Sequence, residues 1–148
     1  MKPSFVEILK TTASRGEKAR MIAEKIRTGK GYSWVGLYDV KENEIKIISG
    51  AGRTEPVIDS FPKDKGLNGR AVAQGKTVIV NDIDSDEDYL LTFTNTKSEI
   101  VVPVFDRGHK KIIGTIDVEG ETKNAFSDED GNFLESCAKE IAELWDKI

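Results

Sequence analysis

The hydrophobic residues of the chain change from helical to alternating spacing, and back to helical, between its two ends. Near the start, Phe5, Ile8 and Leu9 share one side of a short helix that Ser4 can cap. Residues 16–27 then repeat apolar side chains every three or four positions, which predicts a second helix with one buried stripe. The stripe consists of Ala19, Ile22, Ala23 and Ile26. We expect this helix to stop at the two glycines of TGKGY.

Alternating or continuous apolar runs fill the middle of the chain and predict strands. SWVGLYDV (33–40) and EIKIISGAG (44–52) flank a polar turn and should form a hairpin. SEIVVPVF (98–105) and KIIGTIDVEG (111–120) flank the turn DRGHK and predict a second hairpin. Between the hairpins we expect a short helix at GRAVAQG, a buried strand at KTVIVND and a long loop over 84–97.

The last segment is the clearest helix in the sequence. Ser127 is the expected N-cap, and the acidic residues that follow it complement the positive end of the helix dipole. Its apolar side chains recur at helical spacing, at Phe133, Leu134, Cys137, Ala138, Ile141 and Trp145.

This order of elements predicts an α+β fold of one domain, residues 1–148, because the chain shows no linker and no internal repeat. Paired hairpins favour an antiparallel sheet, with the N- and C-terminal helices packed on one face. The irregular middle of the chain would then cover the other face. A sheet covered by long loops favours a small-molecule pocket.

Composition narrows the functional classes. The chain has 148 residues, of which 38% are hydrophobic and 32% charged, with 22 basic and 26 acidic side chains and a net charge of −4. This acidic balance argues against nucleic acid as a partner. No apolar run is long enough to span a membrane, and MKPSFVEILK lacks a signal-peptide core, so we expect a cytoplasmic protein without membrane association. With one cysteine and one histidine, we expect no disulfide, no metal and no cofactor.

Several chemically suggestive residues have simpler interpretations. Cys137 lies on the apolar stripe of the last helix, so we expect a core residue; the alternative is a reactive thiol. His109 should be a solvated turn residue. The acidic run 82–88 lacks the glycine and glutamate of a calcium-binding loop, so we expect it to be solvated. The glycines of 66–75 lack the Lys-Ser/Thr ending of a phosphate loop.

Five side chains on the predicted strands are harder to explain as structural residues. Trp34 and Tyr38 lie four positions apart in one strand, so they point to the same face. Asp117 and Glu119 likewise share a face, and Glu99 begins an apolar strand, where a carboxylate is costly without a partner. We expect all five to lie on the covered face. The alternative is that both glutamates are hydrated strand ends and that Trp34 is a core residue.

The same segments resemble a GAF domain, and more narrowly the free methionine-(R)-sulfoxide reductases. The resemblance covers about residues 28–120, and the stretches that carry it are WVGLY (34–38), KGLNG (65–69), VNDI (80–83), SEIVVPVF (98–105) and IIGTIDVEG (112–120). It implies a ligand pocket formed by Trp34, Tyr38, Glu99, Asp117 and Glu119, in which aromatic rings surround a methylthio group and carboxylates hold an amino group.

The chain departs from that family's pattern at the residues of the reaction. Asn68 and Thr92 occupy positions where the family has cysteine, the strand around Thr77 carries none, and Glu119 replaces an aspartate. Reduction of a sulfoxide by this route needs a thiolate, which an amide or a hydroxyl cannot replace. The resemblance therefore implies the pocket more strongly than it implies the reaction.

Three functional hypotheses follow. The first is a stand-alone GAF domain that binds free methionine, its sulfoxide or a similar amino acid without converting it, as a sensor or binding protein. The second is a free methionine-(R)-sulfoxide reductase with an altered mechanism. The third is a regulatory dimerisation module in signalling. We expect a homodimer through the terminal helices, on the condition that Trp145 is exposed in the monomer.

Overall fold

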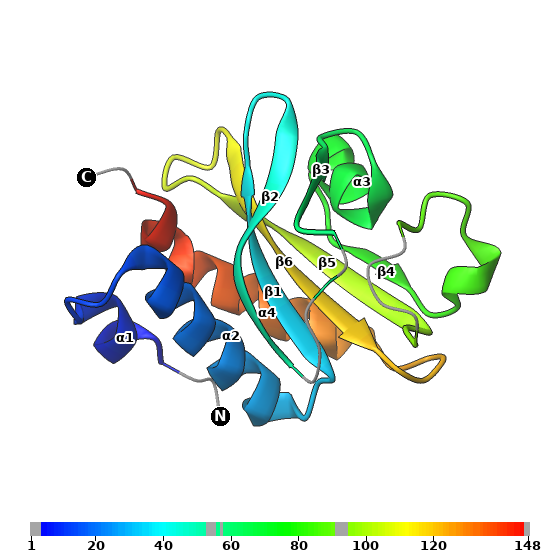
Figure 1. The fold of residues 1–148 in the computed structure, drawn as a ribbon, viewed down its shortest axis with the longest axis horizontal. Coiled ribbons are helices and arrows are strands. Elements are labelled where there is room, and N and C mark those ends of the chain that lie inside the picture. Colours follow the sequence, from blue (N-terminus) through cyan, green and yellow to red (C-terminus); the bar gives the residue numbers. More distant parts are fainter. Residues whose placement is uncertain (1–3, 53–55, 57, 91–94, 147–148) are drawn as a thin grey trace.

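The computed structural model describes residues 4–52, 56, 58–90 and 95–146. Its helices are α1 (Val6–Lys10), α2 (Arg15–Lys30), α3 (Gly66–Gln74) and α4 (Asp128–Ile141), with 3₁₀ turns η1 (Ile83–Ser85) and η2 (Ala142–Trp145). Its strands are β1 (Trp34–Val40), β2 (Glu44–Gly52), β3 (Ser60–Pro62), β4 (Val78–Val80), β5 (Ser98–Phe105) and β6 (Ile112–Gly120). Figure 1 shows them in one curled sheet with helices around it.

The sheet confirms the α+β prediction. Its six strands are ordered β3-β2-β1-β6-β5-β4, and every neighbouring pair is antiparallel. Both predicted hairpins form, as β1–β2 and β5–β6. The strand expected at KTVIVND forms, but it is limited to Val78–Val80 at the edge of the sheet. Its expected burial is wrong for two of these three residues, which are half-buried.

The helix ends follow local chemistry. Ser14 caps α2 by accepting a hydrogen bond from the Glu17 amide, and Gly31 ends it in the left-handed conformation, at φ 72°. Gly29 therefore lies inside the helix and does not end it. Ser127 is the N-cap of α4, as expected. Ser4 is not the N-cap of α1, because Phe5 holds that position.

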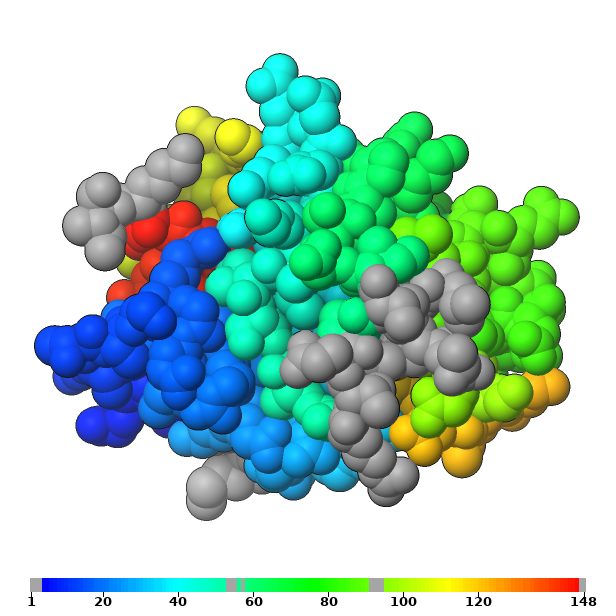
Figure 2. Space-filling model, viewed as in Figure 1, coloured from blue at the N-terminus to red at the C-terminus, as the bar shows by residue number. Residues whose placement is uncertain are grey.

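Because successive side chains of a strand point to opposite faces of the sheet, the buried residues form two layers, one on each face. Helices α2 and α4 pack on one face, against residues such as Leu37, Val102 and Ile116. Cys137 belongs to this layer and is completely buried, so its assignment to the core is confirmed. The opposite face carries Trp34 and Tyr38 and is covered in part by α3. Figure 2 shows α3 and the segment after it as a green surface beside the cyan β2.

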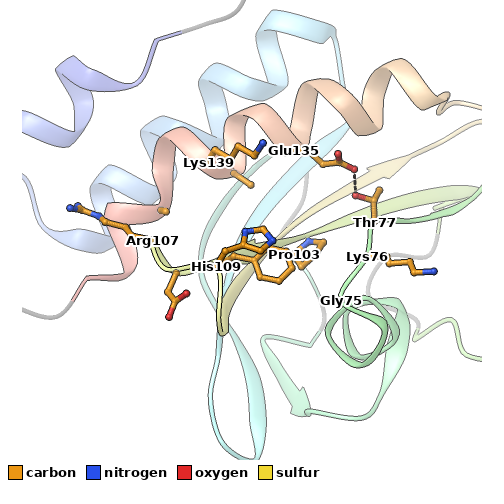
Figure 3. Close-up of a pocket in the computed structure, with 12 residues that line it drawn as sticks. Gly75, Lys76, Thr77, Pro103, Arg107, His109, Glu135 and Lys139 are labelled. Atoms are coloured by element: carbon orange, nitrogen blue, oxygen red, sulfur yellow. Dashed lines mark hydrogen bonds between the residues drawn. The ribbon is translucent and has the colours of Figure 1, made fainter.

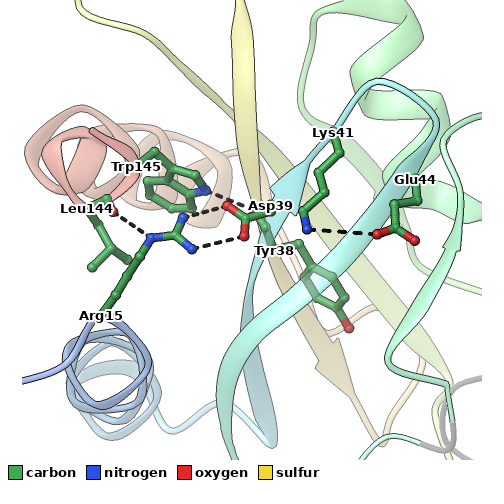
Figure 4. A network of polar contacts seen from close by, with 7 residues as sticks. All are labelled: Arg15, Tyr38, Asp39, Lys41, Glu44, Leu144 and Trp145. Atoms are coloured by element: carbon green, nitrogen blue, oxygen red, sulfur yellow. Dashed lines mark hydrogen bonds and ion pairs between the residues drawn. The ribbon is translucent and has the colours of Figure 1, made fainter. Parts of the chain in front are cut away.

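The C-terminal turn is locked onto the sheet (Figure 4). The Trp145 indole Nε1 donates to the main-chain carbonyl of Tyr38 at 3.1 Å, and Trp145 is only 8% exposed. Arg15 donates to the Leu144 carbonyl and pairs with both oxygens of Asp39. The condition set for the homodimer, an exposed Trp145, is therefore not met. A dimer through the terminal helices stays a prediction without that support.

Among the described residues, no helix combines the length and the apolar character needed to cross a bilayer.

Candidate functional site

Three carboxyl groups meet on the α3 side of the sheet, on two adjacent strands. Glu99 on β5 lies directly opposite Glu119 on β6, and Asp117 is two positions earlier on β6. One carboxylate oxygen from each of the three lies within 4.8 Å of the others. We call these three residues the carboxylate cluster. The prediction that they share the covered face is confirmed, and the alternative of hydrated strand ends is wrong, because all three are buried.

The cluster gathers three acidic side chains in a buried part of the protein. Within the described part of the chain, no lysine or arginine forms an ion pair with Glu99 or Asp117. Glu119 accepts hydrogen bonds from the Thr96 hydroxyl at 2.8 Å and the Tyr89 hydroxyl at 3.2 Å. These hydroxyl groups orient the carboxylate. Buried charge of this kind calls for bound protons or a bound cation.

The pKa values of Glu99 and Asp117 favour bound protons at this site. Burial raises the pKa of Glu99 well above its usual value, and the charges of Asp117 and Glu119 raise it further. Burial also raises the pKa of Asp117, although hydrogen bonds from Glu99 and Asn68 oppose the shift. A proton held by Glu99 and donated to Asp117 accounts for both directions. The cluster therefore takes up protons more readily than exposed carboxyl groups do.

Asn68, at the start of α3, is the next residue in contact with the cluster. Its amide Nδ2 donates to Asp117 Oδ2 at 3.0 Å, and its Oδ1 accepts from the Thr115 hydroxyl at 2.6 Å. Thr115 thus fixes the orientation of the amide, and the amide engages one oxygen of Asp117. The other oxygen, Oδ1, has no donor among the described residues. Thr92, the other position predicted to replace a cysteine, lies outside the described residues.

Two aromatic side chains complete the site. The rings of Trp34 and Tyr38 meet edge to face with centroids 6.4 Å apart, and Trp34 lies beside Glu119 in the strand register. The hydroxyl of Tyr38 is buried and has no hydrogen-bond partner within the described residues. Burial, followed by the charge of the cluster, raises the pKa of Tyr38 well above its usual value. A neutral, unsatisfied hydroxyl beside the carboxylates is a group that a polar ligand can satisfy.

Glycines make room for the indole of Trp34. A Cβ at Gly36 would lie 2.1 Å from the ring, and one at Gly50 would lie 2.8 Å from it. Such distances are far below a van der Waals contact. The indole therefore rests directly on the backbone of β1 and β2.

The segment between β4 and β5 is tied to α3. Arg70 donates to Asp86 at 2.6 Å and to Asp88 at 2.9 Å. We expected a solvated acidic loop over 82–88, which is wrong for Asp86, because its carboxylate is largely buried against Arg70. Sequence reasoning did not identify Arg70, Tyr89 or Thr96, since nothing in a loop sequence indicates which strand it covers. Thr115 could have been identified, because it alternates with Asp117 and Glu119.

The chemistry available at this site is binding of a cation. A protonated amine fits three carboxylates and two aromatic faces. Three buried carboxylates are also an oxygen-donor set for a hard divalent ion. Among the described residues, no thiol faces the cluster, because Cys137 lies in the core on the helix side of the sheet.

Comparison with known proteins defines the family. A family model described as GAF domain matches residues 13–146. The chain therefore belongs to the GAF domain family. Its sequence is 34% identical over 110 residues to GAF domain-containing protein A of Dictyostelium discoideum, a match that covers 73% of this chain and 66% of that protein.

Within this family, the chain is similar to free methionine-R-sulfoxide reductases. It is 31% identical to the reductase of Saccharomyces cerevisiae over 74% of this chain and 61% of that protein, so both curated relatives extend beyond the matched region. The structure of the type II reductase of Thermoplasma acidophilum superposes with a TM-score of 0.80 at 32% identity, covering 88% of this chain and 94% of that one. The substrate-bound reductase of Neisseria meningitidis gives 0.83 at 27% identity, covering 95% and 83%.

Proposed function

We propose that this GAF domain binds a small amine-bearing metabolite, such as free methionine, its sulfoxide or another amino acid, without converting it. The observation that carries the proposal is the carboxylate cluster: three buried carboxyl groups beside two aromatic rings, with no ion-paired cation at Glu99 or Asp117 among the described residues. An ammonium group would offset one negative charge of the cluster and gain cation–π stabilisation from the rings.

The similarity to reductases of free methionine sulfoxide supports the choice of amino acids as the first ligands to test. The chain's own residues support binding rather than turnover. Asn68 stands near the cluster as a hydrogen-bonded amide, and the only cysteine in the sequence is buried across the sheet. An amide and a hydroxyl can position a ligand, but neither can form the covalent sulfur intermediate that thiols form.

Isothermal titration calorimetry with a panel of free amino acids tests the proposal. L-Methionine and N-acetylmethionine form the decisive pair, because acetylation removes the ammonium charge and keeps the side chain. We expect the free amino acid to bind and the acetylated compound to bind at least about tenfold more weakly. Equal binding of the two, or no binding by any member of the panel, would refute the proposal.

Two substitutions test whether the ligand binds at the carboxylate cluster. Glu99→Gln keeps the shape of the side chain but cannot release a proton to become the carboxylate that pairs with an ammonium group, so the affinity should fall by about tenfold or more. Glu42→Gln, at an exposed position in the first hairpin turn, makes the same chemical change away from the site and should bind like the parent protein. Titrations with Mg²⁺ and Ca²⁺ examine the metal alternative. Binding of these ions in the absence of amino-acid binding would contradict the proposed ligand.

A second candidate function is reduction of free methionine-(R)-sulfoxide, which the similarity to named reductases favours. That reaction takes two electrons and two protons from a dithiol, which becomes a disulfide, and releases the sulfoxide oxygen as water. Incubation with dithiothreitol and the sulfoxide, followed by quantification of methionine, tests it. Turnover that Cys137→Ser abolishes would establish the reductase and refute the non-catalytic proposal.

A further inference from the structure

We propose that a second cleft in this protein binds a small aromatic carboxylate, independently of the carboxylate cluster. The cleft has a volume of about 680 Å³ and lies at the edge of the sheet, past the end of β4. Figure 3 shows Glu135 and Lys139 of α4 on one side and Gly75, Lys76 and Thr77 on the other. Such a volume is typical of small-molecule pockets.

The cleft and the carboxylate cluster lie at opposite ends of β5. Glu99 is the second residue of that strand and Phe105 is the last, which corresponds to about 20 Å along the backbone. The strand β4 pairs only with residues 99–101 of β5, so the rest of that edge borders the cleft. Pro103 lies on this open edge and has no N–H group, which disfavours addition of a strand from another chain. A small molecule is therefore the better occupant.

One wall of the cleft is an aromatic platform. The imidazole of His109 stacks on the ring of Phe105, with centroids 4.1 Å apart and planes inclined by 20°. The backbone of His109 adopts φ 56°, and its N–H donates to the Asp106 carbonyl at 2.9 Å. His109 was expected to be a solvated turn residue. It is exposed and in the turn, but the turn holds its ring in a fixed stack that a flat ligand can extend.

The charges around the cleft favour an anion. Its lining has three basic residues, Lys76, Arg107 and Lys139, against two acidic ones, Asp106 and Glu135. The two carboxylates are held by hydrogen bonds within the protein, Glu135 from the Thr77 hydroxyl and Asp106 from the amides of Lys110 and Lys111. Neither Lys76 nor Lys139 forms an ion pair with any described residue.

The third cation, Arg107, is paired with Asp146 at 2.7 Å. The small side chains of Ala138 and Ala142, both nearly buried, form the apolar floor. A flat apolar ring fits against this floor and the aromatic platform, and the lining residues Lys76 and Lys139 are the cations that would attract its carboxylate. This combination selects for an aromatic anion over an aromatic cation or a small anion without a ring.

Three probes separate these requirements: indole-3-acetate carries ring and anion, tryptamine carries the same ring and a cation, and acetate carries only the anion. Amide chemical shifts of the ¹⁵N-labelled full chain should change on addition of indole-3-acetate at residues 75–77, 105–110 and 135–142. Tryptamine and acetate should bind at least about tenfold more weakly. Equal response to all three probes, or shifts elsewhere in the chain, would overturn the proposal.

Two variants check the chemistry without depending on the core. His109→Gly removes the ring and tolerates the left-handed backbone, and Lys76→Glu reverses one charge. Each should weaken binding of indole-3-acetate by about fivefold or more, whereas Lys46→Glu on β2 should not. Methionine binding at the carboxylate cluster should be unchanged in all three variants. A doubled molecular mass with no response to the probes would instead assign the cleft to a second copy of the chain, and would also overturn the proposal.

Discussion

The amide of Asn68 donates to Asp117 Oδ2, and the hydroxyl of Thr115 prevents that amide from turning over. Oδ2 of Asp117 is thereby held by the protein, and Oδ1 is left for a proton or a ligand. Asn68 thus orients one carboxylate of the site.

Asn68→Ala should lower the stability of the fold and raise the pKa of Asp117. The substitution removes a hydrogen bond to a buried carboxylate, so the free energy of unfolding should fall by about 1–3 kcal/mol in urea denaturation. Because the Asn68 amide lowers the pKa of Asp117, that pKa should rise further in the variant. Asn68→Asp should be worse than Asn68→Ala at neutral pH, since it adds a fourth acid. Greater stability of Asn68→Asp would contradict this role.

Stability should fall as pH rises above the usual range of carboxyl groups. The pKa values of Glu99 and Asp117 are raised in the folded state, so the folded protein holds more protons than the unfolded chain from about pH 4 upward. The free energy of unfolding then decreases with pH, by up to about 1.4 kcal/mol per pH unit for each extra proton. Urea denaturation at several pH values measures the slope.

Glu99→Gln isolates the contribution of the cluster to this slope. The variant cannot take up that proton, so its stability should decrease less steeply with pH than that of the parent protein. Glu42→Gln should keep the parental slope. Parallel curves for Glu99→Gln and the parent would show that Glu99 is ionised throughout the range, contrary to the raised pKa.

Gly36→Ala should disturb the site through Trp34. The new Cβ would lie 2.1 Å from the indole, so the ring must move away from the backbone of β1. We expect a loss of about 1–3 kcal/mol in the free energy of unfolding, typical of overpacking, and a shift in tryptophan fluorescence. Gly16→Ala is the matched control. Its Cβ meets nothing within 4 Å inside α2, so stability should rise by about 0.5–1 kcal/mol.

Trp145→Phe tests the link between the C-terminal turn and β1. The hydrogen bond from the indole to the Tyr38 carbonyl is lost while an aromatic ring remains in the space above Gly114. A cost of about 1–3 kcal/mol in the free energy of unfolding is expected for leaving that buried carbonyl without the indole donor.

Light scattering on the parent protein and the variant also measures the molecular mass, and a monomeric mass would refute the predicted homodimer.

The strands and the faces they present could be predicted from the sequence. Alternation alone put Trp34 and Tyr38 on one face and Asp117 and Glu119 on one face, because side chains of a strand repeat every two residues. Which strands are neighbours is not encoded in that pattern. The adjacency of Glu99 to Glu119 depends on the pairing of β5 with β6, which the turn DRGHK made predictable.

The covering segments were not predictable in the same way. Arg70 and Asp86 lie 16 residues apart in irregular sequence, and their ion pair depends on how the chain folds back over the sheet. The exposure of Trp145, which was the condition for the homodimer, also could not be decided from the sequence. The indole is buried because Gly114 leaves a space that it fills.

Asn68 and Arg70 belong to the same short helix, α3, and each has a separate task. Asn68 holds Asp117, while Arg70 holds the segment with Asp86 and Asp88. A rigid shift of α3 that breaks the ion pairs of Arg70 would also weaken the hydrogen bond from Asn68 to Asp117. If a ligand enters under this segment, its entry and the orientation of Asp117 would be coupled through the nine residues of α3.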